Sequence, residues 1–228
     1  MRLSVIIPVY NEESTITGVI EQVRQCGVPQ LQIIVVNDCS QDGTRERLQA
    51  LPPAEDLLIV HHQINQGKGA AIRTGQSLVS GDVVVVQDAD LEYSPTEFPN
   101  MLQFIESDKA DAVYGSRYSG STTLVDSFWH FYGNKLITGF FNLVANLHLT
   151  DMETCYKMVR ADIFKSLKLS SNRFGFEPEI SAKLAKRHCR IYEVPIEYRP
   201  RRYGQGKKIG WRDGLAAFWH IIKFNLLS

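Results

Sequence analysis

The sequence predicts an α/β fold, a single domain in which helices flank a mostly parallel central sheet. Short β-branched runs alternate with amphipathic stretches through the first half of the chain, which is the rhythm of βαβ units. One run, Val83–Val86, is apolar throughout, as expected of a strand that is covered on both faces. The 228 residues, 44% of them hydrophobic and 22% charged, suffice for one sizeable core.

Five strands are expected in the first half, at residues 3–9, 33–37, 57–61, 83–87 and 112–114. Right-handed crossovers bring the loops that follow parallel strands to one edge of a sheet, where ligands bind. Polar residues stand in these loops, and we therefore expect them to gather at that edge. The loop residues in chain order are Tyr10, Asn11 and Glu12, then Asp38, then Asn65 to Gly69, then Asp88, Ala89 and Asp90.

The second half predicts a helix at 128–147, a short segment at 155–159, a helix near 177–187 and a last strand at 190–194. Another helix is expected to begin at residue 94. Ser94 is suited to its N-cap, Pro95 to its first position, and Glu97 to closing a capping box.

Composition excludes several classes of protein. Lys+Arg and Asp+Glu number 25 each, so the net charge of zero argues against a nucleic-acid partner held by bulk positive charge. The four cysteines are scattered without metal-ligand spacing, which indicates a reduced cytosolic protein without zinc. We expect neither a signal peptide nor a membrane span. The basic stretch 198–208 is a candidate anion site.

The carboxylates after the valine run form a candidate metal site. Asp88, Asp90 and Glu92 supply oxygen ligands that suit Mg²⁺ or Mn²⁺ shared with a diphosphate. The alternative is a solvated loop whose aspartate caps the next helix, but Ser94 already serves there.

The other loops each allow two interpretations. Tyr10 and Glu12 form a pair that suits a nucleobase. Asp38 suits a base or ribose, unless it, Ser40 or Asp42 starts a helix. Lys68 lies in a Gly-Lys-Gly turn, which fits either a diphosphate contact or a plain helix start. The full phosphate-loop and dinucleotide-binding glycine patterns are absent from the sequence.

In this order, the segments at 7–12, 36–40, 65–69, 88–92 and 115–117 resemble the family-2 inverting glycosyltransferases. Within that family the chain is most similar to the dolichyl- or undecaprenyl-phosphate mannose or glucose synthases. The resemblance continues through 151–157, 193–196 and 206–214. It implies a GT-A-like fold with a nucleotide-sugar-binding half (1–118), an acceptor half (119–210) and a C-terminal amphipathic helix (211–228).

The resemblance also implies roles for individual residues. It implies that the nucleoside is held by Pro8, Tyr10, Glu12 and Asp38, and that the metal and diphosphate are bound by Asp88, Asp90 and Glu92. Lys68 and Ala89 would complete the nucleotide-sugar site. Arg117 would lie beside the sugar or acceptor phosphate, and Arg201 and Lys207 would close on the phosphates. One position departs from the pattern, because Leu124 stands where relatives carry an arginine before the Phe-Trp-His triplet. His130, Arg173 or Arg202 are the candidates to replace that arginine.

The expected reaction transfers a hexose from a GDP-mannose or UDP-glucose type of donor to a polyprenyl phosphate. Such an acceptor is already an anion and needs no base, so Asp90, Arg117 and Arg201 are the main catalytic candidates. If the acceptor is a hydroxyl, Asp151 or Glu153 is the candidate base. A catalytically silent nucleotide-sugar-binding subunit is the third alternative.

A lipid acceptor implies work at the cytoplasmic face of a membrane. The apolar segment 211–228 is expected to lie in that interface, unless it docks on the core or on a partner. An oligomer or a membrane-subunit partner is compatible with either arrangement.

Overall fold

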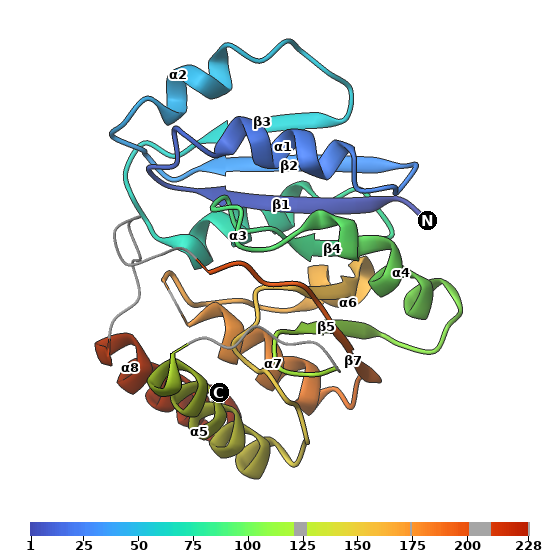
Figure 1. The fold of residues 1–228 in the computed structure, drawn as a ribbon, viewed down its shortest axis with the longest axis vertical. Coiled ribbons are helices and arrows are strands. Elements are labelled where there is room, and N and C mark those ends of the chain that lie inside the picture. The colour runs from blue at the N-terminus through green and yellow to red at the C-terminus, as the bar shows by residue number, and fades with distance from the viewer. Residues whose placement is uncertain (121–126, 174, 201–210, 228) are drawn as a thin grey trace.

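The computed structural model describes residues 1–120, 127–173, 175–200 and 211–227. Among these, seven strands form one sheet in the order β3-β2-β1-β4-β6-β5-β7 (Figure 1). Neighbouring strands are parallel except for β6, which is antiparallel to both β4 and β5. The strands are β1 (Leu3–Val9), β2 (Leu31–Asn37), β3 (Leu57–His61), β4 (Val83–Val86), β5 (Ala112–Ser116), β6 (Lys157–Arg160) and β7 (Ile191–Pro195). The predicted α/β class and mostly parallel sheet are confirmed.

Helices flank this sheet (Figure 1). They are α1 (Ile16–Arg24), α2 (Thr44–Gln49), α3 (Lys68–Leu78), α4 (Phe98–Glu106), α5 (Phe128–Ala145), α6 (Ala161–Ser166), α7 (Phe176–Lys186) and α8 (Trp211–Ile222). A 3₁₀ turn, η1 (Pro95–Glu97), precedes α4, and a π-helical turn, η3 (Lys223–Leu227), follows α8. The sequence did not predict α6. No helix in the described part of the chain is both long and apolar enough to span a membrane.

The predicted capping box at Ser94 is wrong. The Ser94 hydroxyl contacts the Thr96 hydroxyl at 2.8 Å and makes no capping bond to a backbone N–H. The Glu97 carboxylate accepts instead from the backbone N–H of Glu197, at 3.1 Å. The chain tightens here into η1, and a distant segment takes the carboxylate that the local pattern assigned to the cap.

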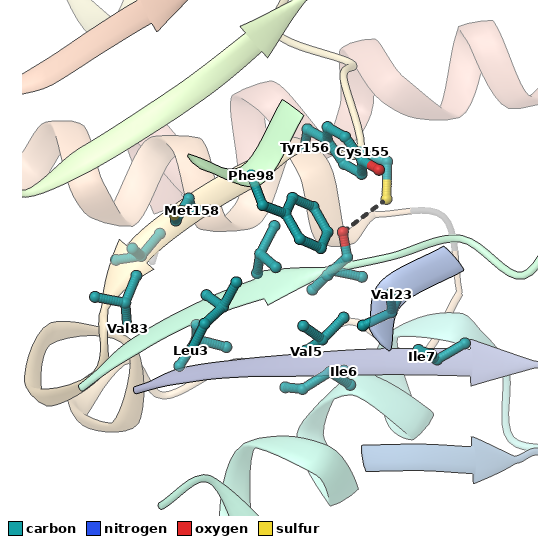
Figure 2. Packing of buried hydrophobic residues seen from close by; sticks show 14 of the residues in the cluster. Leu3, Val5, Ile6, Ile7, Val23, Val83, Phe98, Cys155, Tyr156 and Met158 are labelled. Carbon is teal, nitrogen blue, oxygen red and sulfur yellow. Dashed lines mark hydrogen bonds between the residues drawn. The ribbon is translucent and has the colours of Figure 1, made fainter. Parts of the chain in front are cut away.

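The core explains why β4 is apolar on both faces. Its four valines are buried, because β1 and β6 flank the strand within the sheet and helices cover the faces of the sheet. Figure 2 shows Leu3 of β1 beside Val83, with Val5 of β1, Phe98 of α4 and Met158 of β6 in the same cluster. Helix α3 packs close to β1 because its residue Gly75 has no side chain. A Cβ atom at this position would lie 2.5 Å from Ile6 Cγ2 of β1.

A second, smaller cluster joins α5, α7 and the C-terminal helix. It contains Phe141, Met152, Ala182, Ile221 and Phe224, all buried. Figure 1 shows α5 and α8 side by side, and the rings of Phe140 and Phe218 meet at 5.3 Å between them. One face of the C-terminal segment is therefore docked on the protein, as the core-docking alternative expected.

The close approach of α3 to β1 gives a stability test. We expect Gly75→Ala to lower the free energy of unfolding by about 1–3 kcal/mol, because Ile6 must shift to admit the methyl group. The matched control is Gly18→Ala in α1, where an added Cβ meets nothing within 4 Å. The control should gain up to about 1 kcal/mol from helix propensity. Equal urea-unfolding curves for the two variants would contradict this packing.

Candidate active site

A cavity of about 440 Å³ opens at the sheet edge where β1, β2, β4 and β5 end. Because β6 runs antiparallel, the loop that precedes it reaches the same edge. The lining residues are Pro8, Val9, Tyr10, Glu12, Asp38, Asn65, Gly67, Lys68, Ala71, Asp88, Ala89, Asp90, Glu92, Tyr93, Arg117, Glu153, Cys155, Arg173, Glu177 and Tyr198. Most of the residues singled out in the sequence thus meet at one place.

The Asp38 side chain fixes the loop at the end of the cavity next to β2. Its carboxylate accepts from the backbone N–H groups of Gln66 at 2.9 Å and Gly67 at 2.7 Å, and it contacts His62 Nδ1 at 2.7 Å. Asp42, and not Asp38, accepts from the first N–H of α2, at 3.0 Å. The helix-start alternative for Asp38 is therefore wrong, and its buried carboxylate holds the loop that leads into α3.

Lys68 is the cation of the central part of the cavity. Its ammonium group lies 2.7 Å from Asp88 Oδ1 and 2.9 Å from Glu177 Oε1. Burial favours the neutral amine, but Asp88 leads a group of anionic neighbours that outweighs burial and raises the pKa of Lys68 well above its usual range. The lysine is also the first residue of α3, so the helix-start interpretation is confirmed, and the diphosphate contact stays a prediction.

Arg117 forms a buried ion pair behind the cavity wall. Its Nε and Nη2 atoms donate to the two Asp151 oxygens at 2.7 and 2.8 Å, and Asp151 is fully buried. Burial alone would raise the pKa of Asp151, but the guanidinium of Arg117 outweighs burial and lowers it. Asp151 does not line the cavity. Its geometry is that of a residue that positions Arg117, and the assignment of Asp151 as a base finds no support.

Glu153 lines the cavity next to this pair and differs from every carboxylate above. Its Oε1 atom is shielded from solvent and has no hydrogen-bond partner among the residues that the structure describes. Burial, reinforced by the charge of Glu177, raises the pKa of Glu153 to about 7. Of the two bases considered for a hydroxyl acceptor, the structure therefore favours Glu153, since a base works best with a pKa near neutrality.

Seven carboxyl groups and three cationic side chains line the described cavity, a ratio that bears on the predicted metal. A diphosphate would be repelled by this excess unless a divalent cation came with it. The carboxylates of Asp88 and Asp90 are hard oxygen donors that fit Mg²⁺ or Mn²⁺. Glu92 fits less well, because its Oε2 atom accepts from the Tyr198 hydroxyl at 2.6 Å.

Within the described residues, no group of three or more His, Cys, Asp or Glu side chains forms a ready metal cluster. Asp88, Asp90 and Glu92 thus do not build a three-carboxylate cage. Mg²⁺ needs only one or two protein carboxylates when phosphate and water complete its shell, so Asp88 and Asp90 stay our predicted ligands.

Several predicted residues lie outside the described chain. They are Arg201, Arg202, Lys207 and Leu124. Of the two other candidates for the missing arginine, Arg173 lines the cavity, whereas His130 lies on α5 and does not line it.

Among the residues that line the cavity, the sequence did not single out Tyr93 or Glu177, and it included Tyr198 only as the first residue of the basic stretch. The Tyr198 ring packs between Tyr93 and the guanidinium of Arg117, with ring centroids 5.1 Å apart and the Arg117 Cζ atom at 5.2 Å. Glu177 arrives from the first turn of α7, over a hundred positions after Lys68. Tyr93 directly follows the predicted carboxylate segment 88–92, so its place in the sequence was a usable signal, whereas no local pattern links Glu177 or Tyr198 to the loops.

A family model described as "Glycosyl transferase family 2" matches residues 4–168. The chain is 31% identical to an undecaprenyl-phosphate mannosyltransferase of Micrococcus luteus, with 99% of both chains covered. It is 28% identical to a dolichol-phosphate mannosyltransferase of Pyrococcus furiosus, over 92% of this chain but only 60% of that protein.

Among solved structures, glucosyl-3-phosphoglycerate synthase from Mycobacterium tuberculosis, in complex with Mn²⁺, UDP and glucosyl-3-phosphoglycerate, matches with a TM-score of 0.73. The identity is 20%, and the match covers 98% of this chain and 78% of that one. At this identity the likeness concerns the fold.

The ion pair behind the cavity wall gives a second stability test. We expect Asp151→Asn to lower the free energy of unfolding by about 3 kcal/mol or more at neutral pH, because Arg117 is left charged and buried. The difference from wild type should shrink as pH falls below about 4, the pKa of an ordinary aspartate, because the unfolded chain then gains a proton that the folded carboxyl takes up only at lower pH.

The matched control for this test is Asp56→Asn. Asp56 also takes a two-pronged contact from an arginine, Arg24, but the side chains are 31% and 28% exposed. That loss should stay within about 1 kcal/mol. Urea unfolding measures both, and similar losses would mean that the buried pair has no special weight.

Proposed function

Since this chain belongs to glycosyl transferase family 2, it is a glycosyltransferase, and we propose that it moves a hexose from a nucleoside-diphosphate sugar to a polyprenyl phosphate. GDP-mannose and UDP-glucose are the donor types that we propose. The names of two relatives, which specify mannosyl transfer to undecaprenyl and dolichol phosphates, support the proposal. As an enzyme of this family, the chain is not a catalytically silent subunit.

The strand order supports the donor site. Residues proposed to hold the nucleoside follow β2 and β1, namely Asp38, Tyr10 and Glu12, and Pro8 lies within β1. Asp88, Ala89 and Asp90 follow β4, the next strand in the sheet. A nucleoside diphosphate lying across this edge would place its base near β2 and its phosphates near β4, in agreement with the roles inferred from the sequence.

Asp88 and Asp90 would hold the divalent ion that the excess of carboxylates calls for. When bound, such an ion neutralises the charge that builds up on the departing diphosphate. Arg117, kept charged by Asp151, adds a fixed positive charge beside the hexose end of the cavity. We propose that Arg201 and Lys207, from the basic stretch outside the described residues, close on the phosphates.

One observation carries the lipid acceptor: α5 presents its apolar face to solvent. Trp129 is 79% exposed, Leu136 is 66% exposed and Leu143 is 80% exposed, and Phe128 and Tyr132 are exposed beside them. The buried face is partly polar, because Asn134 and Thr138 point inward. A soluble helix normally has the reverse arrangement. Bulky aromatic and aliphatic side chains without an acidic residue suit the interface of a membrane.

This face leads to the cavity. The ring of Phe131 on α5 meets the ring of Tyr118 at 5.4 Å, and the Arg117 guanidinium lies 5.5 Å from the centre of that Tyr118 ring. The phosphate group of a polyprenyl phosphate could thus bind at Arg117 while its hydrocarbon chain lies in a membrane that contacts the exposed face of α5. We therefore propose that the protein works at the cytoplasmic face of a membrane, with or without a partner subunit.

A polyprenyl phosphate attacks the anomeric carbon as an anion, so the chain need only position it and neutralise charge. A second candidate acceptor, a saccharide hydroxyl, would need a base. The near-neutral pKa of Glu153 favours it for that role over the ion-paired Asp151.

The donor site is tested by thermal shift. Wild type is melted with UDP-glucose, GDP-mannose, UDP and GDP, each with and without Mn²⁺, and compared with Asp90→Ala. We expect one donor to raise the melting temperature by several degrees only with metal, and the shift to vanish in Asp90→Ala. Asp162→Ala, on α6 away from the cavity lining, is the control and should keep the shift. No shift in wild type would sink the donor site.

The membrane face is tested by flotation with vesicles of phosphatidylglycerol and phosphatidylethanolamine. We expect wild type to float and Leu136→Glu to lose most of its vesicle-bound fraction, since a charge in the interface opposes insertion. Ile64→Glu is the matched control: Ile64 is 68% exposed, like Leu136, but lies in the loop between β3 and α3. Equal flotation of the two variants would contradict a role for α5.

A further inference from the structure

Glu153 lies in the part of the cavity that the proposed nucleotide would leave to the sugar. In the sheet, β6 follows β4 on the side away from β1 and β2. Glu153 precedes β6, so it stands beyond Asp88 and Asp90 as seen from Asp38 and Tyr10. A donor whose base lies near β2 and whose diphosphate lies near β4 would bring its hexose to Glu153.

The charged groups around Glu153 come from β6, from the end of β5 and from α7, and each already has a partner. Lys157, on β6, donates its ammonium protons to the backbone carbonyls of Met152, at 2.8 Å, and Thr154. Arg117, after β5, binds both oxygens of Asp151. Glu177, on α7, is paired with Lys68 at 2.9 Å. Glu153 is thus left without a cation of its own among these neighbours.

Two consequences follow for the carboxyl group. Its Oε1 atom lacks a partner within the described part of the protein, a costly condition for a buried polar atom unless a ligand supplies one. Burial and the nearby Glu177 raise its pKa to about 7, so a large share of Glu153 keeps its proton at neutral pH. A protonated carboxyl can donate a hydrogen bond and does not repel an anionic donor.

We propose that Glu153 is a specificity-determining residue that binds a hydroxyl of the donor hexose and does so in its protonated, hydrogen-bond-donating form. The inference rests on the proposed function, because it needs a nucleoside-diphosphate sugar in this cavity. It adds a residue that distinguishes the sugar from the bare nucleotide, and it makes sugar recognition dependent on pH.

The test compares dissociation constants for UDP with UDP-glucose, and for GDP with GDP-mannose, by calorimetry with Mg²⁺ between pH 6 and 8.5. The quantity of interest is the sugar-dependent gain, which is the dissociation constant of the nucleoside diphosphate divided by that of the matching nucleotide sugar. It is taken for whichever of the two pairs, UDP with UDP-glucose or GDP with GDP-mannose, wild type binds better. Titration of the phosphates largely cancels in this ratio. Wild type, Glu153→Gln and Glu153→Ala are measured.

We expect the sugar-dependent gain of wild type to fall as pH rises above about 7, by up to tenfold per pH unit. Glu153→Gln, whose amide donates at any pH, should keep the low-pH gain across the range. Glu153→Ala should lose roughly tenfold of the gain at pH 6, as expected for one lost hydrogen bond. The dissociation constants for UDP and GDP themselves should stay unchanged.

Melting temperatures supply a readout that needs no nucleotide. A carboxyl whose pKa is raised on folding stabilises the protein fully below its unfolded pKa, and that contribution is lost as pH rises through the folded value near 7. Wild type should therefore lose stability relative to Glu153→Gln between pH 5 and 8. A merely structural role for the side chain would shift stability without changing the sugar-dependent gain.

Three results would overturn the proposal. An unchanged gain in Glu153→Ala would show that Glu153 does not touch the sugar. A low, pH-independent gain in Glu153→Gln would show that the ionised form binds, as a base for a hydroxyl acceptor would require. If wild type bound none of the four nucleotides, the proposed donor site itself would fail, and this inference with it.

Discussion

The buried ion pair between Arg117 and Asp151 connects the parts of this protein that matter for its activity. Asp151 accepts from both the side chain and the backbone N–H of Arg117, and also from Asn134 on α5 at 3.1 Å. Its own backbone N–H donates to Glu193 of β7 at 3.2 Å. One carboxylate thus ties the end of β5, a strand at the sheet edge and the long helix to a single point. Buried charge of this kind is tolerated only when it is fully compensated, which explains the number of its partners.

The orientation of α5 follows from that demand. The helix turns Asn134 and Thr138 inward, where they serve Asp151 and the backbone N–H of Met152. Because these polar residues occupy the inward face of the helix, the bulky residues Phe128, Trp129 and Leu136 are left on its outer face. The polar inner face and the apolar outer face of α5 therefore have the same cause. In a protein proposed to take its acceptor from a lipid surface, the charge compensation at the cavity also orients the surface that would meet the lipid.

Carboxyl groups outnumber cationic side chains on the described wall of the cavity, and two of the three cations are held in ion pairs. Lys68 is neutralised by Asp88 and Glu177. Arg117 is neutralised by Asp151. Arg173 is the third cationic side chain of the described wall and belongs to neither of these pairs, so a diphosphate would depend on it, on a divalent ion and on the basic stretch after residue 198. Such a site binds the nucleotide and the ion together better than either alone. The carboxyl of Glu153 belongs to neither of these pairs, so we expect its protonation and hydrogen bonding to change most when a ligand binds in the cavity.

Much of this could be read from local patterns, because parallel strands must end at a common edge. Tyr10, Asp38 and Asp88 each follow an apolar run, and right-handed connections leave them no other place to gather. The patterns could not show that β6 turns back between β4 and β5, since strand direction depends on pairing partners and not on the strand's own residues. That reversal delivers Glu153 to the cavity, and long-range packing delivers Glu177. The inverted face of α5 was hidden for the same reason: apolar spacing marks a helix, but which side is buried depends on what the rest of the chain offers, and here it offers a carboxylate.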